Sequence, residues 1–308
     1  MGSVDLSVII CTLNRSQFVR KCLEALATQE CSRPSIEVVV VDNGSTDDTR
    51  AVAESFTSNN LTIRYIYEGQ RGLGHARNAG LHASTGRYLA YLDDDAVPSQ
   101  GWCAAICETF EQLNTEGNAI VAALGGPIAP VFETKRPEWL TEELGALYTI
   151  LNLGESVKAF PQGAHPFGAN CAFRRDVLLR HPWNENINMC DEVELFSRLG
   201  KESYRWLYVP EMRVDHFLPA SRLTINYILN RFFAEGIAQL RLRRDIWQKS
   251  QLCISASAKM PVAWALSVFG PRERRLLFRC KTKLYLGYWV GLLGLRKVAS
   301  ASVNAYRT

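Results

Sequence analysis

Three carboxylates in a row, Asp93, Asp94 and Asp95, come directly after the apolar run at positions 88–92. A short apolar run that ends at turn-forming residues is typical of a strand buried on both faces. Neighbouring carboxylates in a poorly hydrated place repel one another unless a cation lies between them. Because carboxylate oxygens are ligands for hard cations, the pattern predicts a Mg²⁺ or Mn²⁺ site at the end of this strand. A solvated acidic turn is the alternative that these residues leave open.

The elements that must position these acids alternate along the chain. Apolar runs fit for buried strands occur at 6–11, 36–41, 61–67, 87–92 and 120–124, with helical patterns between them. This alternation predicts a parallel, twisted α/β sheet with right-handed crossovers. Farther along, extended segments are predicted at 204–209 and 212–217, a helix is predicted to open at Asp191, and a long amphipathic helix is predicted at 223–247.

Other polar residues follow the predicted strands in the same way as the three aspartates. Asn14 and Arg15 come after the first strand, and Asp42 comes after the second. Ligands of open α/β sheets bind beyond the carboxyl ends of the strands. We therefore expect these side chains and the aspartates to meet in one crevice, which disfavours the solvated-turn alternative.

Composition restricts the class of protein. The chain has 308 residues, of which 47% are hydrophobic, and it shows no repeat. Its nine cysteines are odd in number and lack a C-x-x-C pair, so we expect reduced thiols and a cytosolic protein. The first predicted strand lies so close to Met1 that we expect no signal peptide. No G-x-G-x-x-G follows that strand, which argues against a dinucleotide-dependent oxidoreductase.

The charge is unevenly distributed. Residues 1–219 hold 19 Lys and Arg against 28 Asp and Glu, whereas residues 220–308 hold 16 against 3. A basic C-terminal region predicts an anionic partner. We expect an anionic membrane surface and no nucleic acid, because no nucleic-acid recognition motif is present. The apolar run 284–295 is too short to span a bilayer, which needs about 20 residues. It could be an interfacial helix, a helix packed within the protein or a contact with another subunit. The run is flanked by Lys281, Lys283, Arg296 and Lys297.

Five motifs, taken together, resemble those of the family 2 glycosyltransferases. They follow the family's order and cover about residues 5–220: Ser7 to Arg15, Val40 to Asp47, Gly74 to Gly80, Leu92 to Asp95 and Asp191 to Leu195. The resemblance implies the GT-A fold, with a Rossmann-like, mostly parallel central sheet flanked by helices. It also implies a nucleotide-diphosphate sugar donor, which we expect to be UDP-linked, a divalent metal, Mn²⁺ or Mg²⁺, and inversion at the anomeric carbon.

The resemblance also implies a division into domains. Residues 1–220 would be the catalytic domain, with a nucleotide-sugar-binding half at about 1–125 and an acceptor half at about 126–220. Residues 221–308 would be a helical basic extension that associates with the inner face of a membrane. The acceptor would be a hydroxyl of a saccharide or of a lipid-linked saccharide, in polysaccharide or glycoconjugate synthesis.

Donor-binding roles can be carried over position by position. Asp42 matches the aspartate that holds the base of the nucleotide, where its carboxylate can accept the uracil imide N–H. Further positions match the family's contacts to the nucleotide or the diphosphate: Thr12, Asn14, Arg15, Arg77, Asn78 and Arg222. Arg15 offers charge to the diphosphate. Arg77 could instead pair with Asp42 or Asp93.

The aspartate triplet matches the family's DXD motif. We expect Asp93 to face the ribose and the metal, Asp95 to bind the metal that bridges the phosphates, and Asp94 to support either role. His216 falls where many relatives place a third metal ligand, and an imidazole can join carboxylates around Mn²⁺. The metal would neutralise charge on the leaving diphosphate.

A second acidic pair, Asp191 and Glu192, stands where the family most often has Glu-Asp. One of the two is expected to be the base that deprotonates the acceptor hydroxyl. Alignment favours Glu192, but the exchanged order keeps Asp191 as an alternative. Asn170 and Trp139 could line the sugar or acceptor site, because aromatic faces suit sugar rings.

Two other classes of protein fit these residues less well. A sugar-phosphate nucleotidyltransferase would have a Gly-rich basic loop after the first strand, where this chain has Thr12 to Ser16. A catalytically inactive GT-A protein that only binds sugar nucleotides or membranes would be expected to have lost a metal-binding or base carboxylate. This chain keeps all of them.

Overall fold

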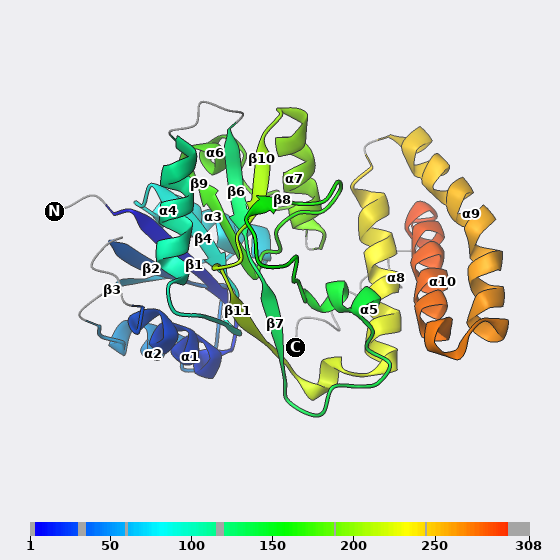
Figure 1. The fold of residues 1–308 in the computed structure, drawn as a ribbon, viewed down its shortest axis with the longest axis horizontal. Coiled ribbons are helices and arrows are strands. Elements are labelled where there is room, and N and C mark those ends of the chain that lie inside the picture. The colour runs from blue at the N-terminus through cyan, green and yellow to red at the C-terminus, as the bar shows by residue number, and fades with distance from the viewer. Residues whose placement is uncertain are drawn as a thin grey trace. The chain divides into compact units, whose positions relative to one another are not determined.

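The computed structural model describes residues 4–29, 35–58, 61–114, 120–187, 189–243 and 245–294 (Figure 1). The contacts divide the chain into two units. The first unit comprises residues 1–131 and 149–217, and the second comprises residues 132–148 and 218–308. Residues 132–148, which we expected in the acceptor half of the catalytic domain, therefore group with the C-terminal region.

A mixed β-sheet forms the centre of the first unit. Within the described residues its eight strands lie in the order β3 (Leu61–Tyr67), β2 (Ile36–Asp42), β1 (Leu6–Thr12), β4 (Tyr88–Leu92), β9 (Asn170–Arg174), β6 (Val121–Gly125), β10 (Arg205–Tyr208) and β8 (Lys158–Ala159). Strands β3, β2, β1 and β4 run parallel to one another, and β6 runs parallel to β10. This agrees with the mostly parallel sheet that was predicted. In contrast, β9 runs antiparallel between β4 and β6.

The register brings the carboxyl ends of the parallel strands together. Thr12 of β1 lies opposite Asp42 of β2, which lies opposite Tyr67 of β3. Strand β2 is buried along its whole length, because its residues before Asp42 are almost all β-branched and fit a pleated surface covered on both sides. The polar residue that follows each buried strand is therefore placed at one common edge.

Helices cover both faces of this sheet (Figure 1). They are α1 (Ser16–Ala27), α2 (Thr49–Ser55), α3 (Leu73–Ala83), α4 (Trp102–Asn114), α6 (Arg175–Arg180) and α7 (Asp191–Lys201). Alternate side chains of β1 show the two faces, since Val8 and Ile10 pack with α1 and α4, whereas Ile9 packs with α3, α6 and α7. Each such buried aliphatic side chain contributes roughly 1.5–3 kcal/mol to folding.

A small second sheet brings a distant segment to the end of β4. Within the described residues its strands lie in the order β5 (Ala96–Pro98), β11 (Val214–Leu218) and β7 (Ile128–Phe132). Strand β5 directly follows the three aspartates, and its antiparallel register places His216 opposite Ala96. The imidazole of His216 is thereby brought beside the aspartate triplet.

At the amino ends of the strands, Glu37 forms a buried hydrogen-bonded centre and is only 3% exposed. Its Oε1 accepts hydrogen bonds from the Ser7 hydroxyl at 2.6 Å and from the Thr85 N–H and hydroxyl at 2.6 and 2.9 Å. The Arg64 guanidinium lies 3.5 Å from Oε2. Burial alone would raise the pKa of Glu37, but the hydrogen bonds from Ser7 and Thr85 outweigh it and lower that pKa.

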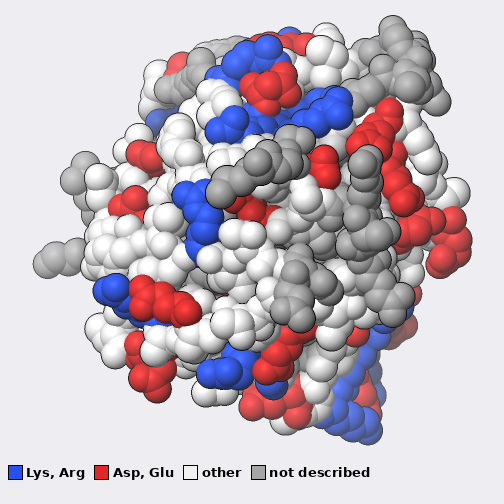
Figure 2. Space-filling view, turned by 90° about the vertical axis from the view of Figure 1, so that its left-hand side faces the viewer, with Lys and Arg blue, Asp and Glu red and all other residues white. Residues whose placement is uncertain are grey.

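Acidic and basic side chains both occur across the face shown in Figure 2, with several acidic ones together near its right-hand edge.

The second unit is helical. Its elements are α5 (Glu142–Gly145), η1 (Ala146–Tyr148), η2 (Ala220–Arg222), α8 (Ile225–Arg241), α9 (Ile246–Phe269) and α10 (Arg272–Leu292). The long helix predicted at 223–247 is wrong, because α8 ends at Arg241. A new helix then begins after Asp245, whose carboxylate accepts a hydrogen bond from the Gln248 N–H at 2.7 Å and so caps α9.

Helix α10 packs closely on α8. A Cβ atom added to Gly287 would lie 2.3 Å from the Phe233 carbonyl oxygen, and one added to Gly236 would lie 2.2 Å from the Leu284 carbonyl oxygen. The Tyr288 hydroxyl also donates a hydrogen bond of 2.7 Å to the side chain of Gln239. Of the alternatives for the apolar run 284–295, its described part is thus packed within the protein. The remaining predicted residues, Leu295, Arg296 and Lys297, lie outside the described residues.

Candidate active site

Two of the three aspartates after β4 form a cluster with His216. The candidate ligand atoms of Asp93, Asp95 and His216 all lie within 4.8 Å of one another. His216 is held from both sides of its ring, with Nε2 3.0 Å from Asp95 Oδ1 and Nδ1 3.0 Å from the Thr149 hydroxyl. Two carboxylates and one oriented imidazole are a donor set that suits Mn²⁺.

The middle aspartate, Asp94, is bound to residues that follow β1. It accepts hydrogen bonds of 2.7 Å from the Thr12 hydroxyl and from Arg15 Nη1. The same Arg15 nitrogen lies 2.7 Å from Asp95 Oδ2. The structure therefore places Thr12 and Arg15 on the aspartates, where Arg15 partly neutralises two carboxylates.

The pKa of each carboxyl group in this cluster depends on burial and on the charges of its neighbours. Burial, followed by the charge of Asp95, raises the pKa of Asp93. Burial also raises the pKa of Asp94 to about 6, although Arg15 opposes the shift. Burial would raise the pKa of Asp95 as well, but the hydrogen bond and charge of His216, together with Arg15, bring it well below its usual range. More negative charge than the local cations can balance is therefore gathered here, and a divalent cation would relieve it.

Asp42 lies at the end of β2 and is 2% exposed. Its Oδ1 accepts a hydrogen bond of 2.7 Å from the Ser45 N–H, and its Oδ2 accepts one of 2.9 Å from the Tyr65 hydroxyl. Asn14, which has a positive φ of 54°, accepts a hydrogen bond of 2.7 Å from the Thr46 N–H. The loops that follow β1 and β2 are thus joined to each other beside the fixed carboxylate of Asp42.

The second acidic pair lies at the start of α7 and shares one buried arginine. Arg77 of α3 is 3% exposed, and its Nη1 binds the carboxylate of Asp191. Its Nη2 lies 3.3 Å from Glu192 Oε1. The guanidinium also lies over the indole of Trp183, 4.3 Å from the ring centre. The alternative partners predicted for Arg77, Asp42 and Asp93, are corrected to Asp191 and Glu192, since α3 lies beside the start of α7.

The two carboxyl groups of this pair differ in their environment. Burial and the charge of Glu192 raise the pKa of Asp191 to about 7. For Glu192, burial acts in the same direction, but the charge of Arg77 outweighs it and holds the pKa well below its usual range. The Glu192 side chain is 20% exposed and that of Asp191 is 7% exposed. Glu192 is thus the more accessible of the two carboxyl groups, and the charge of Arg77 favours its ionised form.

Gly168 completes this cluster, and no role was predicted for it from the sequence. Its N–H donates a hydrogen bond of 3.1 Å to Glu192 Oε1. A Cβ atom added here would lie 2.0 Å from Arg77 Nη2 and 2.4 Å from Glu192 Oε1. A side chain at this position would displace both groups. The signal in the sequence is a lone glycine just before a strand, which is common in many other settings.

Two predicted site residues have structural hydrogen bonds instead. The Asn78 amide donates to the Trp183 carbonyl oxygen and to Glu185, both at 2.9 Å, and its oxygen accepts from the Trp183 N–H at 3.0 Å. The Asn170 oxygen accepts from the Trp102 indole at 2.9 Å, and its amide donates to the Met212 carbonyl oxygen. These bonds disfavour the ligand contacts that we predicted for both residues.

Trp139 and Arg222 belong to the second unit. Arg222 ends η2, and its carbonyl oxygen accepts a hydrogen bond of 2.9 Å from the Tyr148 hydroxyl. Their roles in binding acceptor and diphosphate stay predictions.

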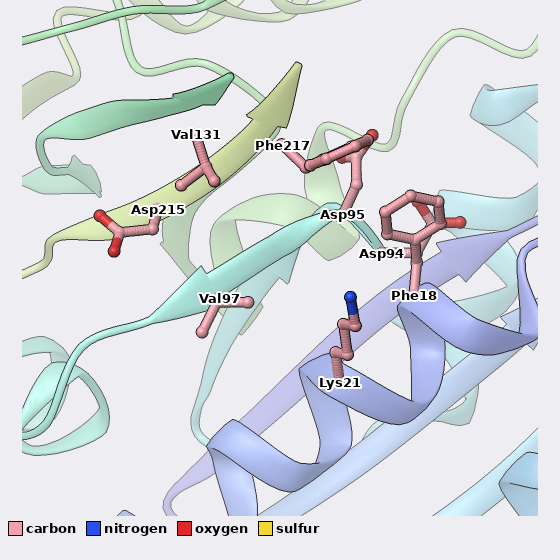
Figure 3. Close-up of a pocket in the computed structure, with 8 residues that line it drawn as sticks. All are labelled: Phe18, Lys21, Asp94, Asp95, Val97, Val131, Asp215 and Phe217. Atoms are coloured by element: carbon pink, nitrogen blue, oxygen red, sulfur yellow. The ribbon is translucent and has the colours of Figure 1, made fainter. Parts of the chain in front are cut away.

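A pocket of about 220 Å³ reaches the aspartates from the side of α1 and β11 (Figure 3). Its lining combines four apolar side chains with three aspartates and one lysine. The lining residues are Phe18, Lys21, Asp94, Asp95, Val97, Val131, Asp215 and Phe217. The pocket therefore adjoins the candidate metal-binding cluster at Asp95.

Comparison with known proteins agrees with this geometry. Residues 7–181 match the model of the family "Glycosyl transferase family 2". The chain is similar to a glucosyl-dolichyl phosphate glucuronosyltransferase of Haloferax volcanii, with 23% identity over 77% of this chain and 76% of the relative. It is also similar to the succinoglycan biosynthesis protein ExoM of Rhizobium meliloti, with 25% identity over 96% of this chain and 95% of the relative.

A solved structure with a similar fold is the mannosyltransferase PcManGT of Pyrobaculum calidifontis in complex with GDP-Man and Mn²⁺. The TM-score is 0.56 at 20% identity, covering 99% of this chain and 76% of that one. The fold is thus the predicted GT-A fold. Because the family model matches more than half of its residues, the chain belongs to glycosyl transferase family 2 and is a glycosyltransferase.

Proposed function

We propose that this glycosyltransferase is metal-dependent and inverting, and that it moves a sugar from a UDP-sugar to a hydroxyl of a saccharide or a lipid-linked saccharide. One observation carries the proposal: a metal-binding cluster and a buried acid pair lie close together. The closeness of the two clusters is supported by the effect of the charges of Arg77 and Glu192 on the pKa of Asp93. A donor's diphosphate and an acceptor's hydroxyl would need to meet in such a place.

On the donor side, Asp42 receives the base of the nucleotide. Its carboxylate is fixed by Ser45 and Tyr65 and still has acceptor capacity for the imide N–H of uracil. Because the N–H groups of guanine could meet the same carboxylate, the test below compares UDP with GDP.

Asp93, Asp95 and His216 would hold Mn²⁺ or Mg²⁺, with Mn²⁺ favoured by the imidazole. When bound, the cation supplies Lewis-acid stabilisation of the leaving diphosphate. Its charge would also offset the burial and the charge of Asp95 that raise the pKa of Asp93. PcManGT, a protein of similar fold, is described with GDP-Man and Mn²⁺, which supports a nucleotide-sugar donor and this cation.

On the acceptor side, Glu192 is the base, and Arg77 holds it together with Asp191. The acceptor oxygen forms a bond to the anomeric carbon while the bond from that carbon to the diphosphate oxygen breaks. The hydroxyl proton passes to the ionised carboxylate of Glu192. A single displacement of this kind inverts the anomeric configuration.

The acceptor class and the compartment rest on other observations. One relative is named for transfer to glucosyl-dolichyl phosphate and another for succinoglycan biosynthesis, which supports a lipid-linked or polysaccharide acceptor. The odd number of cysteines in the sequence and the lack of a C-x-x-C pair support a reducing compartment and hence the cytoplasm.

The test is calorimetric titration of the full chain with UDP and with GDP, each with and without Mn²⁺, followed by donor hydrolysis across a panel of UDP-sugars and GDP-mannose. We expect UDP to bind more tightly than GDP and only with the cation present, and one UDP-sugar to be hydrolysed. Tighter binding of GDP would overturn the choice of nucleotide. Binding that is equal with and without Mn²⁺ would overturn the metal site, and absence of hydrolysis for every donor would argue against catalysis.

A further inference from the structure

Helix α9 stands out within the second unit. In the described part of the chain it is the one helix that is long and apolar enough to cross a membrane by length and composition, with 24 residues from Ile246 to Phe269. Only 17% of its most apolar stretch is buried. A helix in the core of a protein would instead be covered on most sides.

Large apolar side chains recur along the exposed side of α9, with the exposed amide of Gln251 among them. Six large side chains on this side are between 58% and 79% exposed: Ile246, Trp247, Ile254, Val262, Trp264 and Phe269. The charged residues of α9 are Lys249 and Lys259, and at 100° per residue both fall outside the arc that these six occupy. Large apolar side chains exposed along a helix of this length mark a contact with something that the described residues do not supply.

The opposite side of α9 faces its neighbours in the second unit. Cys253, Ala256 and Ala263 are buried there, and Cys253 and Ala256 pack with Leu240 of α8 and Tyr288 of α10. The small side chains let the helices approach closely. The exposed side is therefore fixed in direction by this packing.

Cations flank the apolar surface at both ends. Exposed arginines precede α9 at Arg241 and Arg243 and follow it at Arg272, Arg274 and Arg275. Residues 220–308 hold 16 Lys and Arg against 3 Asp and Glu. Apolar surface with exposed indoles, bordered by arginines, is the combination that suits the boundary between anionic headgroups and acyl chains.

We propose that α9 lies in the plane of an anionic lipid bilayer, with its exposed side inserted at the headgroup boundary and the flanking arginines on the phosphates. This inference rests on the second unit alone and not on the proposed reaction. It narrows the sequence-based expectation of a membrane-associating region at 221–308 to α9, because the described part of 284–295 packs against α8.

The packing of α10 explains why α9 would lie on the bilayer and not cross it. Helix α10 packs along α9, and its first twelve residues contain six cations: Arg272, Arg274, Arg275, Arg279, Lys281 and Lys283. If α9 crossed the membrane with its partner attached, these charges would enter the hydrocarbon, at a cost of several kcal/mol each.

The same charges disfavour a second copy of this chain as the partner of α9. A two-fold contact through the apolar surface would bring two strongly basic regions together. Like charges at close range destabilise such an interface, whereas anionic lipid attracts both ends of the helix.

The experiment is flotation of the full chain with vesicles of phosphatidylcholine and phosphatidylglycerol, compared with vesicles of phosphatidylcholine alone. We expect binding to the anionic vesicles, weakened by salt. Trp264→Ser combined with Phe269→Ser should lower the partition coefficient at least about tenfold, because two large apolar side chains no longer insert. Leu179→Ser, which removes an exposed apolar side chain from α6 in the first unit, is the control and should bind unchanged.

The arginines are tested separately. Arg272→Gln should lower the partition coefficient of the protein for anionic vesicles about fivefold. Arg20→Gln, which changes an exposed residue of α1 in the first unit, should leave that coefficient unchanged. Quenching of tryptophan fluorescence by brominated lipid is an independent measurement on the unaltered chain, and Trp264→Phe should reduce that quenching.

Three results would overturn the proposal. The first is absence of binding to anionic vesicles. The second is binding that Trp264→Ser with Phe269→Ser leaves unchanged. The third is a dimer in lipid-free solution that these substitutions convert to a monomer, since the apolar surface would then be covered by a second copy.

Discussion

Buried acids lie at both ends of the central strands of the first unit, but their surroundings differ. At the amino ends, Glu37 is alone and accepts hydrogen bonds from Ser7 and Thr85, with Arg64 close by. At the carboxyl ends, three aspartates lie together, Arg15 pairs with Asp94 and Asp95, and His216 pairs with Asp95. At the amino ends, the hydrogen-bond donors around Glu37 satisfy its single carboxylate. At the carboxyl ends, the carboxylates outnumber the cationic side chains that pair with them.

The direction of the pKa shifts follows from this difference. The pKa of Glu37 is lowered, because its charge is satisfied by hydrogen bonds. The pKa values of Asp93 and Asp191 are raised, first by burial and then by a neighbouring carboxylate. Beside them, burial is outweighed by His216 and Arg15 at Asp95 and by Arg77 at Glu192, so that the pKa values of these two acids are lowered. A buried acid is thus not a sign of function by itself. An excess of acids over their local partners is the better sign, because a cation or a proton from outside must complete the site.

The largest effect is expected at the acid pair. Glu192→Gln removes the proposed base while keeping the shape of the side chain, and transfer to the acceptor should fall by about 10²–10⁴-fold. Binding of UDP with Mn²⁺, measured by calorimetry, should stay unchanged. Asp191→Asn is the matched variant. If it abolishes transfer and Glu192→Gln does not, then Asp191 is the base.

The next effect is expected at the metal-binding cluster. Asp95→Ala removes a proposed ligand that His216 also orients, so the Mn²⁺-dependent affinity for UDP should fall about a hundredfold. Asp176→Ala is the control, since this exposed aspartate of α6 pairs with Arg180 and does not line the pocket. Equal losses in the two variants would argue against a specific metal site.

A smaller loss of transfer is expected from Gly168→Ala. The added methyl group would displace Arg77 and Glu192, and a shift of about 1 Å at the base costs up to about a hundredfold in rate. Nucleotide binding should persist. Gly200→Ala in α7 is the control, because a Cβ atom there would meet Trp206 at an ordinary 3.6 Å. Unchanged transfer by Gly168→Ala would show that the base does not depend on this packing.

At the opposite end of the strands, a substitution should affect stability and not the reaction. Glu37→Gln leaves hydrogen-bond donors of Ser7, Thr85 and Arg64 poorly matched and should lower the free energy of unfolding by roughly 1–3 kcal/mol. Urea denaturation measures this change. The affinity of the folded protein for UDP with Mn²⁺ should be the same as before. A loss of affinity without a loss of stability would contradict the contrast between the two ends.

The effect of Glu37 should also depend on pH in a defined direction. Because folding lowers its pKa, the unfolded chain binds the proton more readily than the folded one. Its contribution is complete above the ordinary glutamate pKa of about 4.3 and is lost as the pH falls through the lowered folded value. The difference in stability between the unaltered chain and Glu37→Gln should therefore narrow as the pH is lowered below about 4. A difference that widens would contradict the assignment.

Local patterns were sufficient for the first strands of the sheet. The runs before Asp42 and Asp95 are long, apolar and bounded by turn residues, and the strands were found within one or two residues of the predicted positions. Strand β9 was not predicted, because its five residues, Asn170–Arg174, do not alternate and are antiparallel to both neighbours. Its place between β4 and β6 depends on pairing with segments far away in sequence.

The candidate site likewise has residues that the sequence could identify and contacts that depend on tertiary packing. The aspartate triplet and the acid pair could be recognised from the residues, since carboxylates crowded at the end of a buried element repel one another unless a cation or a proton joins them. The pairing of Arg77 with Asp191 and Glu192 could not be recognised from the sequence. The paired residues are more than a hundred positions apart, and their contact depends on how α3 packs against α7. Similarly, nothing in the local sequence separated Gly168 from other loop glycines.

The antiparallel pairing of β5 with β11 also bears on how the protein becomes functional during synthesis. Asp95 and His216 are 121 residues apart in the chain. Asp93 and Asp95 are therefore synthesised long before His216, and the three candidate ligands come together only when β11 pairs with β5. Contacts of such long range form late in folding. A nascent chain would thus emerge with an incomplete cation site, and a cation that prefers the complete set would favour the folded chain by mass action.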